Sequence, residues 1–252
     1  AAWQAMQSGG QGDALAHPAH APGHGVATSV AQATLSATVC VLEKMLPLAA
    51  ECSVVLARGH DGQVVHLPVQ ANLHRDGILA VTEVGDGALD TALADQALAA
   101  ARDVAQGLDY VGVLCVEFFV LAPDAPGGKP SLVVNEIAPR PHNSGHHTIE
   151  ICQTSQFEQH LRAILNLPLG HTLLIQAGAK INLVGAKNHE GPVFYDGLEK
   201  ALSMPGVHPH LYAKATTKPF RKMGHITITG SNMQDVRNKA QKVKQNIQVI
   251  SK

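Results

Sequence analysis

The fold is decided by two apolar runs, residues 111–121 (VGVLCVEFFVL) and residues 132–137 (LVVNEI), each of which contains one glutamate. Between them, residues 122–130 (APDAPGGKP) consist of turn-forming residues. Two β-forming runs joined by such a loop predict an antiparallel hairpin. If the hairpin is symmetric about the centre of the loop, Glu117 and Glu136 lie opposite each other on the two strands.

This pair of carboxylates is costly unless something compensates for it. Cross-strand neighbours have Cβ atoms about 5 Å apart, and like charges at that distance repel. Burying each carboxylate among apolar residues adds a desolvation penalty. A divalent cation held between Glu117 and Glu136 removes both penalties, so the pair predicts a metal site. The alternative is that both side chains reach solvent at the edge of a sheet.

A polar, cationic loop follows the second run, in residues 138–147 (APRPHNSGHH). Arg140 offers a forked donor for phosphate or carboxyphosphate oxygens. Further side-chain and backbone donors come from His142, Asn143, Ser144 and Gly145. Carboxylates for a metal beside donors for a phosphate outline a nucleotide site, although a polar loop can also hold three histidines by chance.

The composition is that of an ordinary soluble globular protein, with 252 residues, 45% of them hydrophobic, and a net charge of −1. This balance gives no case for a nucleic-acid or membrane partner. No apolar run approaches the roughly 18 residues of a transmembrane helix, and the N-terminus lacks a signal-peptide pattern. The four cysteines are scattered, at Cys40, Cys52, Cys115 and Cys152. We therefore expect free thiols and a cytoplasmic location.

Three regions are expected along the chain, in an α+β arrangement. Residues 1–37 combine the end of a helix with a flexible insert rich in Gly, Ala and His. Residues 38–170 contain the carboxylate hairpin, and residues 171–252 alternate strands and helices in a small α+β lobe. The lobe is expected to contain strands at 180–185, 207–212 and 222–229, and helices at 196–203 and 233–248.

Several elements of the middle region have clear local signals. Strands at 39–43 and 53–58 are expected, the second leading through an Asp-Gly turn into residues 63–68 as a hairpin. A helix over residues 88–106 is expected to be closed by Gly107 as its C-cap. Another helix is expected to begin at Ser155 and to end before Pro168.

Weaker candidates lie on either side of the hairpin. A strand ending in Glu43-Lys44-Met45-Leu46, followed by a polar loop with Glu51, has the outline of an adenosine cradle, yet strand-end glutamates are often simply solvated. His74 is a loop histidine of the kind usually found on surfaces. Near the C-terminus a basic cluster suits either a solvated face or a ribose phosphate, and it consists of Lys214, Lys218, Arg221 and Lys222.

Six strings occur together in this chain: residues 57–62 (ARGHDG), 72–79 (NLHRDGIL), 107–113 (GLDYVGV), 135–146 (NEIAPRPHNSGH), 155–158 (SQFE) and 221–225 (RKMGH). Together they resemble the ATP-grasp superfamily, and within it the family of 5-(carboxyamino)imidazole ribonucleotide synthases. The resemblance covers about residue 38 to the C-terminus. It implies the C-terminal part of an ATP-grasp fold, with an antiparallel sheet and flanking helices, and the small α+β lobe after it.

The resemblance also implies a reaction. ATP phosphorylates bicarbonate to carboxyphosphate, and the exocyclic amine of 5-aminoimidazole ribonucleotide captures the carboxyl group, with release of ADP and phosphate. The implied cofactors are ATP and Mg²⁺ or Mn²⁺, and the intact enzyme is expected to be a homodimer.

Residue roles carry over from the same resemblance. Glu117 and Glu136 hold the metal ions, with Asn135 assisting, and Arg140 faces bicarbonate and carboxyphosphate together with the loop from His142 to His146. The nucleotide pocket takes in Glu43, Lys44, Met45, Leu46, Glu51 and His74. The phosphate of the ribonucleotide is gripped by Lys214, Arg221 and Lys222. Within the loop, the implied catalytic residues are His142, Asn143, Ser144 and His146.

The chain departs from the family's pattern at its N-terminal side. The family's N-terminal α/β domain, its Gly-rich phosphate loop and an upstream phosphate-binding lysine have no match here, so we expect a fragment whose activity on its own is in question. Two alternatives stay open. One is another ATP-grasp ligase, such as a formate-dependent glycinamide ribonucleotide transformylase or a biotin carboxylase, which the NSGH string disfavours. The other is a non-catalytic nucleotide-binding remnant, which the intact Glu117, Glu136 and Arg140 disfavour.

Overall fold

A computed structural model describes residues 44–75, 78–123 and 130–252 of the chain. All of the described strands and helices belong to one compact unit, residues 45–252. The insert and helix end expected within residues 1–37, the strand expected at 39–43 and Glu43 lie outside the described residues. Within the described part of the chain, no helix is both long and apolar enough to cross a bilayer.

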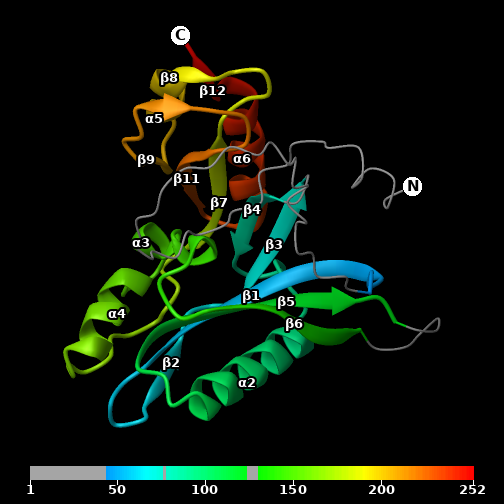
Figure 1. The fold of residues 1–252 in the computed structure, drawn as a ribbon, viewed down its shortest axis with the longest axis vertical. Coiled ribbons are helices and arrows are strands. Elements are labelled where there is room, and N and C mark those ends of the chain that lie inside the picture. Colours follow the sequence, from blue (N-terminus) through cyan, green and yellow to red (C-terminus); the bar gives the residue numbers. More distant parts are fainter. Residues whose placement is uncertain (1–43, 76–77, 124–129) are drawn as a thin grey trace, which may run out of the picture. The chain divides into compact units, whose positions relative to one another are not determined.

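The described residues build a nine-stranded sheet with helices on its faces (Figure 1). Its strand order is β6-β5-β1-β3-β4-β7-β11-β9, with β2 paired to β1, and every pairing is antiparallel. The strands of the first half are β1 (Leu48–Arg58), β2 (Val64–His66), β3 (Gln70–Arg75), β4 (Ile78–Val84), β5 (Gly112–Leu121) and β6 (Ser131–Ala138). The Asp-Gly hairpin between β1 and β2 is confirmed, and Gly62 has a φ of 81°, a value that glycine adopts without steric cost.

The second half continues the same sheet with β7 (Ala177–Val184), β9 (Val207–Leu211) and β11 (Lys222–Gly230). Because β7 pairs with β4 on one side and β11 on the other, the sheet includes strands from both sides of residue 170. The division into domains at residue 170 stays a prediction. A separate three-stranded sheet contains β8 (Gly191–Asp196), β10 (Thr216–Thr217) and β12 (Gln248–Ser251).

Helix α2 (Thr91–Gly107) packs on β1 and β5. It begins three residues later than expected because the Asp90 side chain accepts a hydrogen bond from the Leu93 N–H and caps it. Gly107 is its last residue, and Leu108 is the C-cap. The remaining helical segments are the 3-10 turn η1 (Asn143–Gly145), α3 (Thr148–Ile151), α4 (Gln156–Ile164), α5 (Leu198–Leu202) and α6 (Met233–Asn246).

Two of these helices test local predictions directly. Helix α4 is capped by Ser155, which accepts from the Glu158 N–H, so its predicted beginning is confirmed. Helix α6 ends two residues before the expected residue 248, because β12 begins there and pairs with β8.

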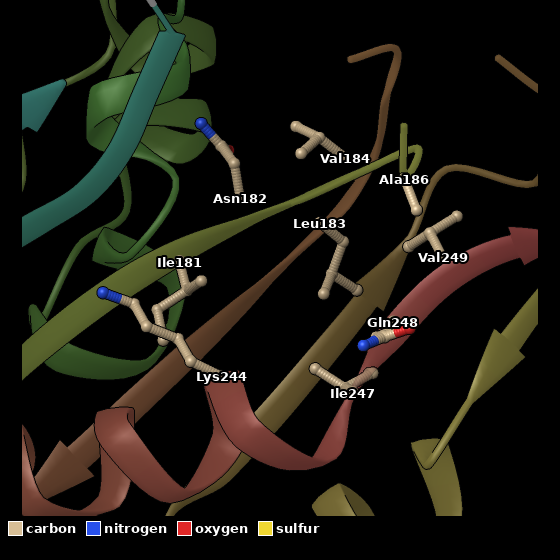
Figure 2. A pocket seen from close by; sticks show the side chains of 9 residues that line it. All are labelled: Ile181, Asn182, Leu183, Val184, Ala186, Lys244, Ile247, Gln248 and Val249. Atoms are coloured by element: carbon tan, nitrogen blue, oxygen red, sulfur yellow. The ribbon is translucent and has the colours of Figure 1, made fainter. Parts of the chain in front are cut away.

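One face of the sheet is covered by α2 and α6, while α3 and α4 lie against the opposite face of β1 and β5, where Val55 and Cys115 pack with Ile151. Cys52, Val54 and Leu56 of β1 pack with β5 residues against α2, while Ile181 and Leu183 of β7 pack toward α6. These two residues of β7 border a pocket of about 310 Å³ beside α6. In Figure 2, Asn182 points to the opposite side of β7 from Ile181 and Leu183. Because side chains alternate along a strand, the residues between these apolar positions face the other side of the sheet.

Candidate active site

The other face of the sheet carries a row of polar residues that crosses neighbouring strands. Residues that are directly paired on neighbouring strands share a face, so the pairings define the row. One series of direct pairs links Glu136, Glu117, Ser53 and Gln70, and a second series links Asn72, Thr82, Lys180 and Thr227. All of these except Glu136 are buried. A polar face of this kind is what a substrate site requires, and the carboxylates of the hairpin lie on it.

Hydrogen bonds hold the middle of this row in place. Ser53 Oγ donates to Gln70 Oε1 at 2.7 Å, and Asn72 Nδ2 donates to Ser53 Oγ at 2.8 Å. Thr82 Oγ1 donates to Asn72 Oδ1 at 3.2 Å. The buried polar groups of β1, β3 and β4 therefore satisfy one another, and the sheet keeps its polar face without large desolvation losses.

The opposed carboxylates at the end of the row confirm the predicted register, with Glu117 on β5 paired to Glu136 on β6. The register shifts by one residue directly afterwards, since Phe118 pairs with Val134 and leaves Asn135 as an extra residue in a β-bulge. Glu117 is 8% exposed. Burial raises its pKa, and the charges of Glu136 and Glu51 add to that rise.

The expected burial of Glu136 is wrong, because its side chain is 50% exposed. Strand β6 is the edge of the sheet, so its side chains have no neighbour on one side. One carboxylate is therefore buried and the other is open to solvent. A buried carboxylate beside an accessible one suits a cation that arrives from solvent.

His142 lies between the two carboxylates, a position that the sequence did not predict. Its Nδ1 is 3.4 Å from Glu117 Oε1, and its Nε2 is 3.9 Å from Glu136 Oε1. Burial, followed by the positive charges of Arg140, Lys180 and Lys222, lowers the pKa of His142 to about 4. The imidazole is therefore neutral at pH 7 and cannot neutralise the carboxylates.

The loop that carries His142 is fixed by Gln156, the first residue of α4. Gln156 Oε1 accepts from the His142 N–H, and its Nε2 donates to the His142 carbonyl, both at 2.9 Å. The same Nε2 lies 2.9 Å from His146 Nδ1. Ser144 Oγ lies 2.8 Å from His142 Nδ1 and 3.3 Å from Cys115 Sγ. The candidate catalytic residues His142, Ser144 and His146 are thus brought together.

Asn143 is held from the sheet rather than from α4. Lys180 Nζ donates to its backbone oxygen and its Oδ1, and Asn182 Nδ2 also donates to that Oδ1. Asn143 Nδ2 is directed at Tyr212 Oη, which lies 3.0 Å from His225 Nδ1. These contacts link the loop to β7 and β11.

Sequence reasoning missed four residues of this network, namely Lys180, Asn182, Tyr212 and His225. Lys180 was placed at the beginning of a strand, whereas β7 begins at Ala177 and Lys180 lies in its middle. A charged residue within an apolar strand is the signal that identified the two glutamates. The same signal would have identified Lys180 if the strand had been predicted to begin before it.

The candidate nucleotide residues are only partly brought together. Glu51 and His74 were both expected in loops, but Glu51 lies within β1, which extends from Leu48, and His74 lies within β3. Glu51 Oε2 is 2.7 Å from His74 Nδ1. Burial raises the pKa of Glu51, whereas burial and the charges of Lys222 and Lys180 lower the pKa of His74.

The segment before β1, residues 44–46, offers little buried surface to a bound nucleotide. Lys44 and Met45 are exposed, and Leu46 is half-buried. An adenine ring bound there would therefore have little enclosed surface within this segment alone, and its place against residues 44–46 stays a prediction.

The basic residues near the C-terminus are held by backbone oxygens. Lys214 Nζ donates to the Lys222 carbonyl at 2.6 Å, and Arg221 Nη1 donates to the Thr216 carbonyl at 2.9 Å. Burial lowers the pKa of Lys222, and the charges of Glu117 and Glu136 oppose that change, so its ammonium lies within electrostatic reach of both carboxylates. Arg140 is exposed and donates to the Pro141 carbonyl.

The donor set of this site fits a hard divalent cation. Glu117 and Glu136 present carboxylate oxygens, the ligands that Mg²⁺ and Mn²⁺ prefer, and the raised pKa of Glu117 includes the like-charge repulsion that such an ion relieves. Cys115, Glu117 and His142 also have ligand atoms close together. Burial raises the pKa of Cys115 to about 12, however, so that thiol is protonated and a poor ligand.

Comparison with known proteins gives this arrangement a family. The family model of the ATP-grasp domain matches residues 5–157, more than half of the chain, and the chain therefore belongs to the ATP-grasp family. The model of the phosphoribosylaminoimidazole carboxylase C-terminal domain matches residues 179–239. Within the ATP-grasp family, the chain belongs to the group of the N5-carboxyaminoimidazole ribonucleotide synthases.

Three relatives illustrate the similarity. The N5-carboxyaminoimidazole ribonucleotide synthase of Synechococcus elongatus is 41% identical over 193 residues, which are 76% of this chain and 46% of that protein. The crystal structure of the synthetase from Thermotoga maritima has a TM-score of 0.74 at 37% identity and covers 83% of this chain and 55% of that one. The Aspergillus clavatus synthase, in complex with ADP and 5-aminoimidazole ribonucleotide, has a TM-score of 0.71 at 34% identity, with coverages of 80% and 52%.

These matches confirm the predicted α+β ATP-grasp fold. The chain spans about half the length of the curated relatives it matches. The activity, substrates and partners of the whole protein are therefore matters of proposal.

Proposed function

We propose that this chain belongs to an enzyme that carboxylates 5-aminoimidazole ribonucleotide with bicarbonate and ATP. ATP transfers its terminal phosphoryl group to bicarbonate, which gives carboxyphosphate and ADP. The exocyclic amine then attacks the carboxyl carbon, the bond to phosphate breaks, and N5-carboxyaminoimidazole ribonucleotide and phosphate leave. The observation that carries this proposal is the Glu117–Glu136 pair directly beside the loop from Arg140 to His146.

Each part of the site has a task in this reaction. Bound Mg²⁺ or Mn²⁺ supplies charge neutralisation to the ATP phosphates, and Glu117 and Glu136 hold it, with Asn135 of the bulge beside them. Arg140 and Lys222 face anionic bicarbonate and carboxyphosphate with positive charge. The neutral imidazole of His142 keeps a lone pair available for a hydrogen bond from a substrate N–H or O–H.

The same proposal assigns residues to the adenosine, the carboxyl group and the phosphate of the ribonucleotide. The adenosine half of ATP lies against residues 43–46 and Glu51, with His74 beside the nucleotide. His146 and Ser144 complete the loop around the carboxyl group. The phosphate of the ribonucleotide is bound by Lys214, Arg221 and Lys222. The intact enzyme is a cytoplasmic homodimer without a nucleic-acid or membrane partner.

The test is ADP release by the intact gene product that contains this chain, in the presence of ATP, Mg²⁺ and bicarbonate. We expect release that depends on 5-aminoimidazole ribonucleotide and falls by about a hundredfold or more in Glu136→Gln, because the variant loses a charge that positions the phosphates. Glu83→Gln is the matched control, since Glu83 pairs with Arg237 away from the site. Nucleotide binding without ribonucleotide-dependent release would contradict the proposal and favour the non-catalytic remnant.

A further inference from the structure

Lys180 is a buried cation that has no task in the reaction as proposed. It lies in the middle of β7, its side chain is fully buried, and it forms no ion pair with a carboxylate among the described residues. Burying a lysine is expensive, and apolar residues of similar volume often replace buried charges without loss of stability. Stability therefore does not explain why this position holds a lysine.

The contacts of Lys180 converge on one residue of the loop. Its Nζ donates to the Asn143 backbone oxygen at 2.8 Å and to Asn143 Oδ1 at 2.7 Å. Asn182, two residues further along the same face of β7, donates from Nδ2 to the same Oδ1 at 3.0 Å and to the Leu79 carbonyl at 2.6 Å. Two donors on one amide oxygen fix which end of the Asn143 amide is which, because the reversed amide would point its own N–H groups at both.

These contacts also determine where the N–H groups of the Asn143 side-chain amide point. With Oδ1 held against β7, Asn143 Nδ2 is turned away from Lys180, and its nearest acceptor is Tyr212 Oη at 3.5 Å, a long contact. Asn143 as a whole is only half-buried, so part of its side chain is open to the site. It lies in the loop between His142 and Ser144, beside the carboxylate pair.

We infer that Lys180 is a positioning residue which, with Asn182, holds the Asn143 amide so that its N–H groups face the carboxylate or phosphate anion that the loop binds. The identity of that anion as bicarbonate or carboxyphosphate rests on the proposed function. Lys180 itself is fully enclosed and does not touch the anion. Burial, followed by the charge of Lys222, lowers the pKa of Lys180 well below its usual value, and the two Asn143 oxygens are its hydrogen-bond acceptors.

The chain offers a matched set of variants. Lys180→Met keeps an unbranched side chain one atom shorter and removes the donor, and Lys180→Gln keeps a neutral donor. Thr227→Val is the control, because Thr227 is the direct neighbour of Lys180 on β11, is equally buried and makes no hydrogen bond through its hydroxyl to any described residue. Each is compared with the unchanged protein for KM of bicarbonate, KM of ATP and melting temperature, in the intact gene product.

We expect Lys180→Met to raise the KM for bicarbonate by about tenfold, the scale of one lost hydrogen bond to a charged ligand, with the KM for ATP and the melting temperature unchanged. Lys180→Gln is expected to recover most of this loss, and Thr227→Val to behave as the unchanged protein. An unchanged bicarbonate KM in Lys180→Met overturns the inference, as does a loss that parallels a lower melting temperature. If the unchanged protein shows no ribonucleotide-dependent ADP release, the proposed function fails instead.

A measurement that needs no enzyme activity distinguishes failure of the positioning role from failure of the proposed function. In a ¹⁵N-labelled sample, the side-chain amide signals of Asn143 are identified by their absence from Asn143→Ala. We expect them to be those of a rigid amide in the unchanged protein and in Thr227→Val, and of a mobile one in Lys180→Met. Equal mobility in all three overturns the positioning role whatever the activity.

Discussion

Three histidines around the loop are kept neutral by their surroundings. Burial lowers the pKa of His146 and of His147 to about 3 and that of His225 to about 2, and neighbouring positive groups, Lys180 among them, add to the effect. His225 stacks on His210 at 4.4 Å between ring centroids, so two protonated rings would repel there. The buried surroundings of the loop therefore keep these three imidazoles uncharged at neutral pH.

These histidines predict acid-labile folding. Between pH 6.5 and their native pKa values the unfolded chain binds protons that the native chain does not, so stability is full above pH 6.5 and is lost as the pH falls. Each contributes about 1.4 kcal/mol per pH unit in that window. Glu51 and Glu117, whose pKa values are raised, act in the opposite direction above pH 4.5. Urea unfolding is therefore expected to have a lower midpoint at pH 5.0 than at pH 7.5, and His147→Gln to show a smaller difference. Equal midpoints would exclude this account.

A buried hydroxyl without a partner gives a second prediction at the residue scale. Thr227 is fully buried on β11, and its Oγ1 makes no hydrogen bond within the part of the chain that the structure describes. Removing an unsatisfied polar group while keeping the shape costs nothing or is stabilising. Thr227→Val is therefore expected to leave the free energy of unfolding unchanged or to raise it by about 1 kcal/mol, as measured in urea. A loss of stability would mean that this hydroxyl has a partner, such as ordered water.

At the scale of elements, small side chains on one face of α2 let the helix pack closely against the sheet. Its buried positions repeat every four residues as Leu93, Ala97, Ala101 and Ala105, so small side chains face β1 and β5. Ala101→Leu is expected to destabilise the protein by about 1–3 kcal/mol through overpacking. Ala99→Leu, on the exposed side of the same helix, is the control and should have almost no effect. Equal urea midpoints for the two variants would show that this face is loosely packed.

Elements with their own local signals could be predicted from the sequence, and those defined by neighbours could not. The Asp-Gly turn, the Ser155 cap and the facing glutamates each depend on residues close in the chain or on hairpin symmetry. Strand β12 is four residues long and is stabilised by β8, a partner distant in sequence, which local patterns do not report. Strands β3 and β4 pair with each other, so the Asp-Gly pair between them in the sequence was a local signal for both, whereas the pairing of β4 with β7 had none. The exposure of Glu136 depends on β6 being an edge, and Lys180 joins the site only because β7 pairs with β4.

At the scale of the whole molecule, the site is shared between sequence regions that could have been separate domains. Glu117 and the loop of His142 precede residue 170, whereas Lys180 and Lys222 follow it, and the strands from both regions belong to one continuous sheet. The β4–β7 pairing crosses the predicted boundary and carries Thr82 opposite Lys180. The polar face therefore exists only when both regions are folded together.

This arrangement predicts a single cooperative unfolding transition for residues on both sides of residue 170, since an unfolded lobe would leave β4 as a bare edge with its polar row broken. The chain has three tyrosines that report on both sides, Tyr110 before the boundary and Tyr195 and Tyr212 after it. With fluorotyrosine incorporated, the ¹⁹F signals of all three are expected to lose intensity at the same urea concentration. If Tyr195 and Tyr212 were to unfold at a clearly lower concentration than Tyr110, the C-terminal lobe would be an independent domain, and the site would assemble by docking of two preformed parts.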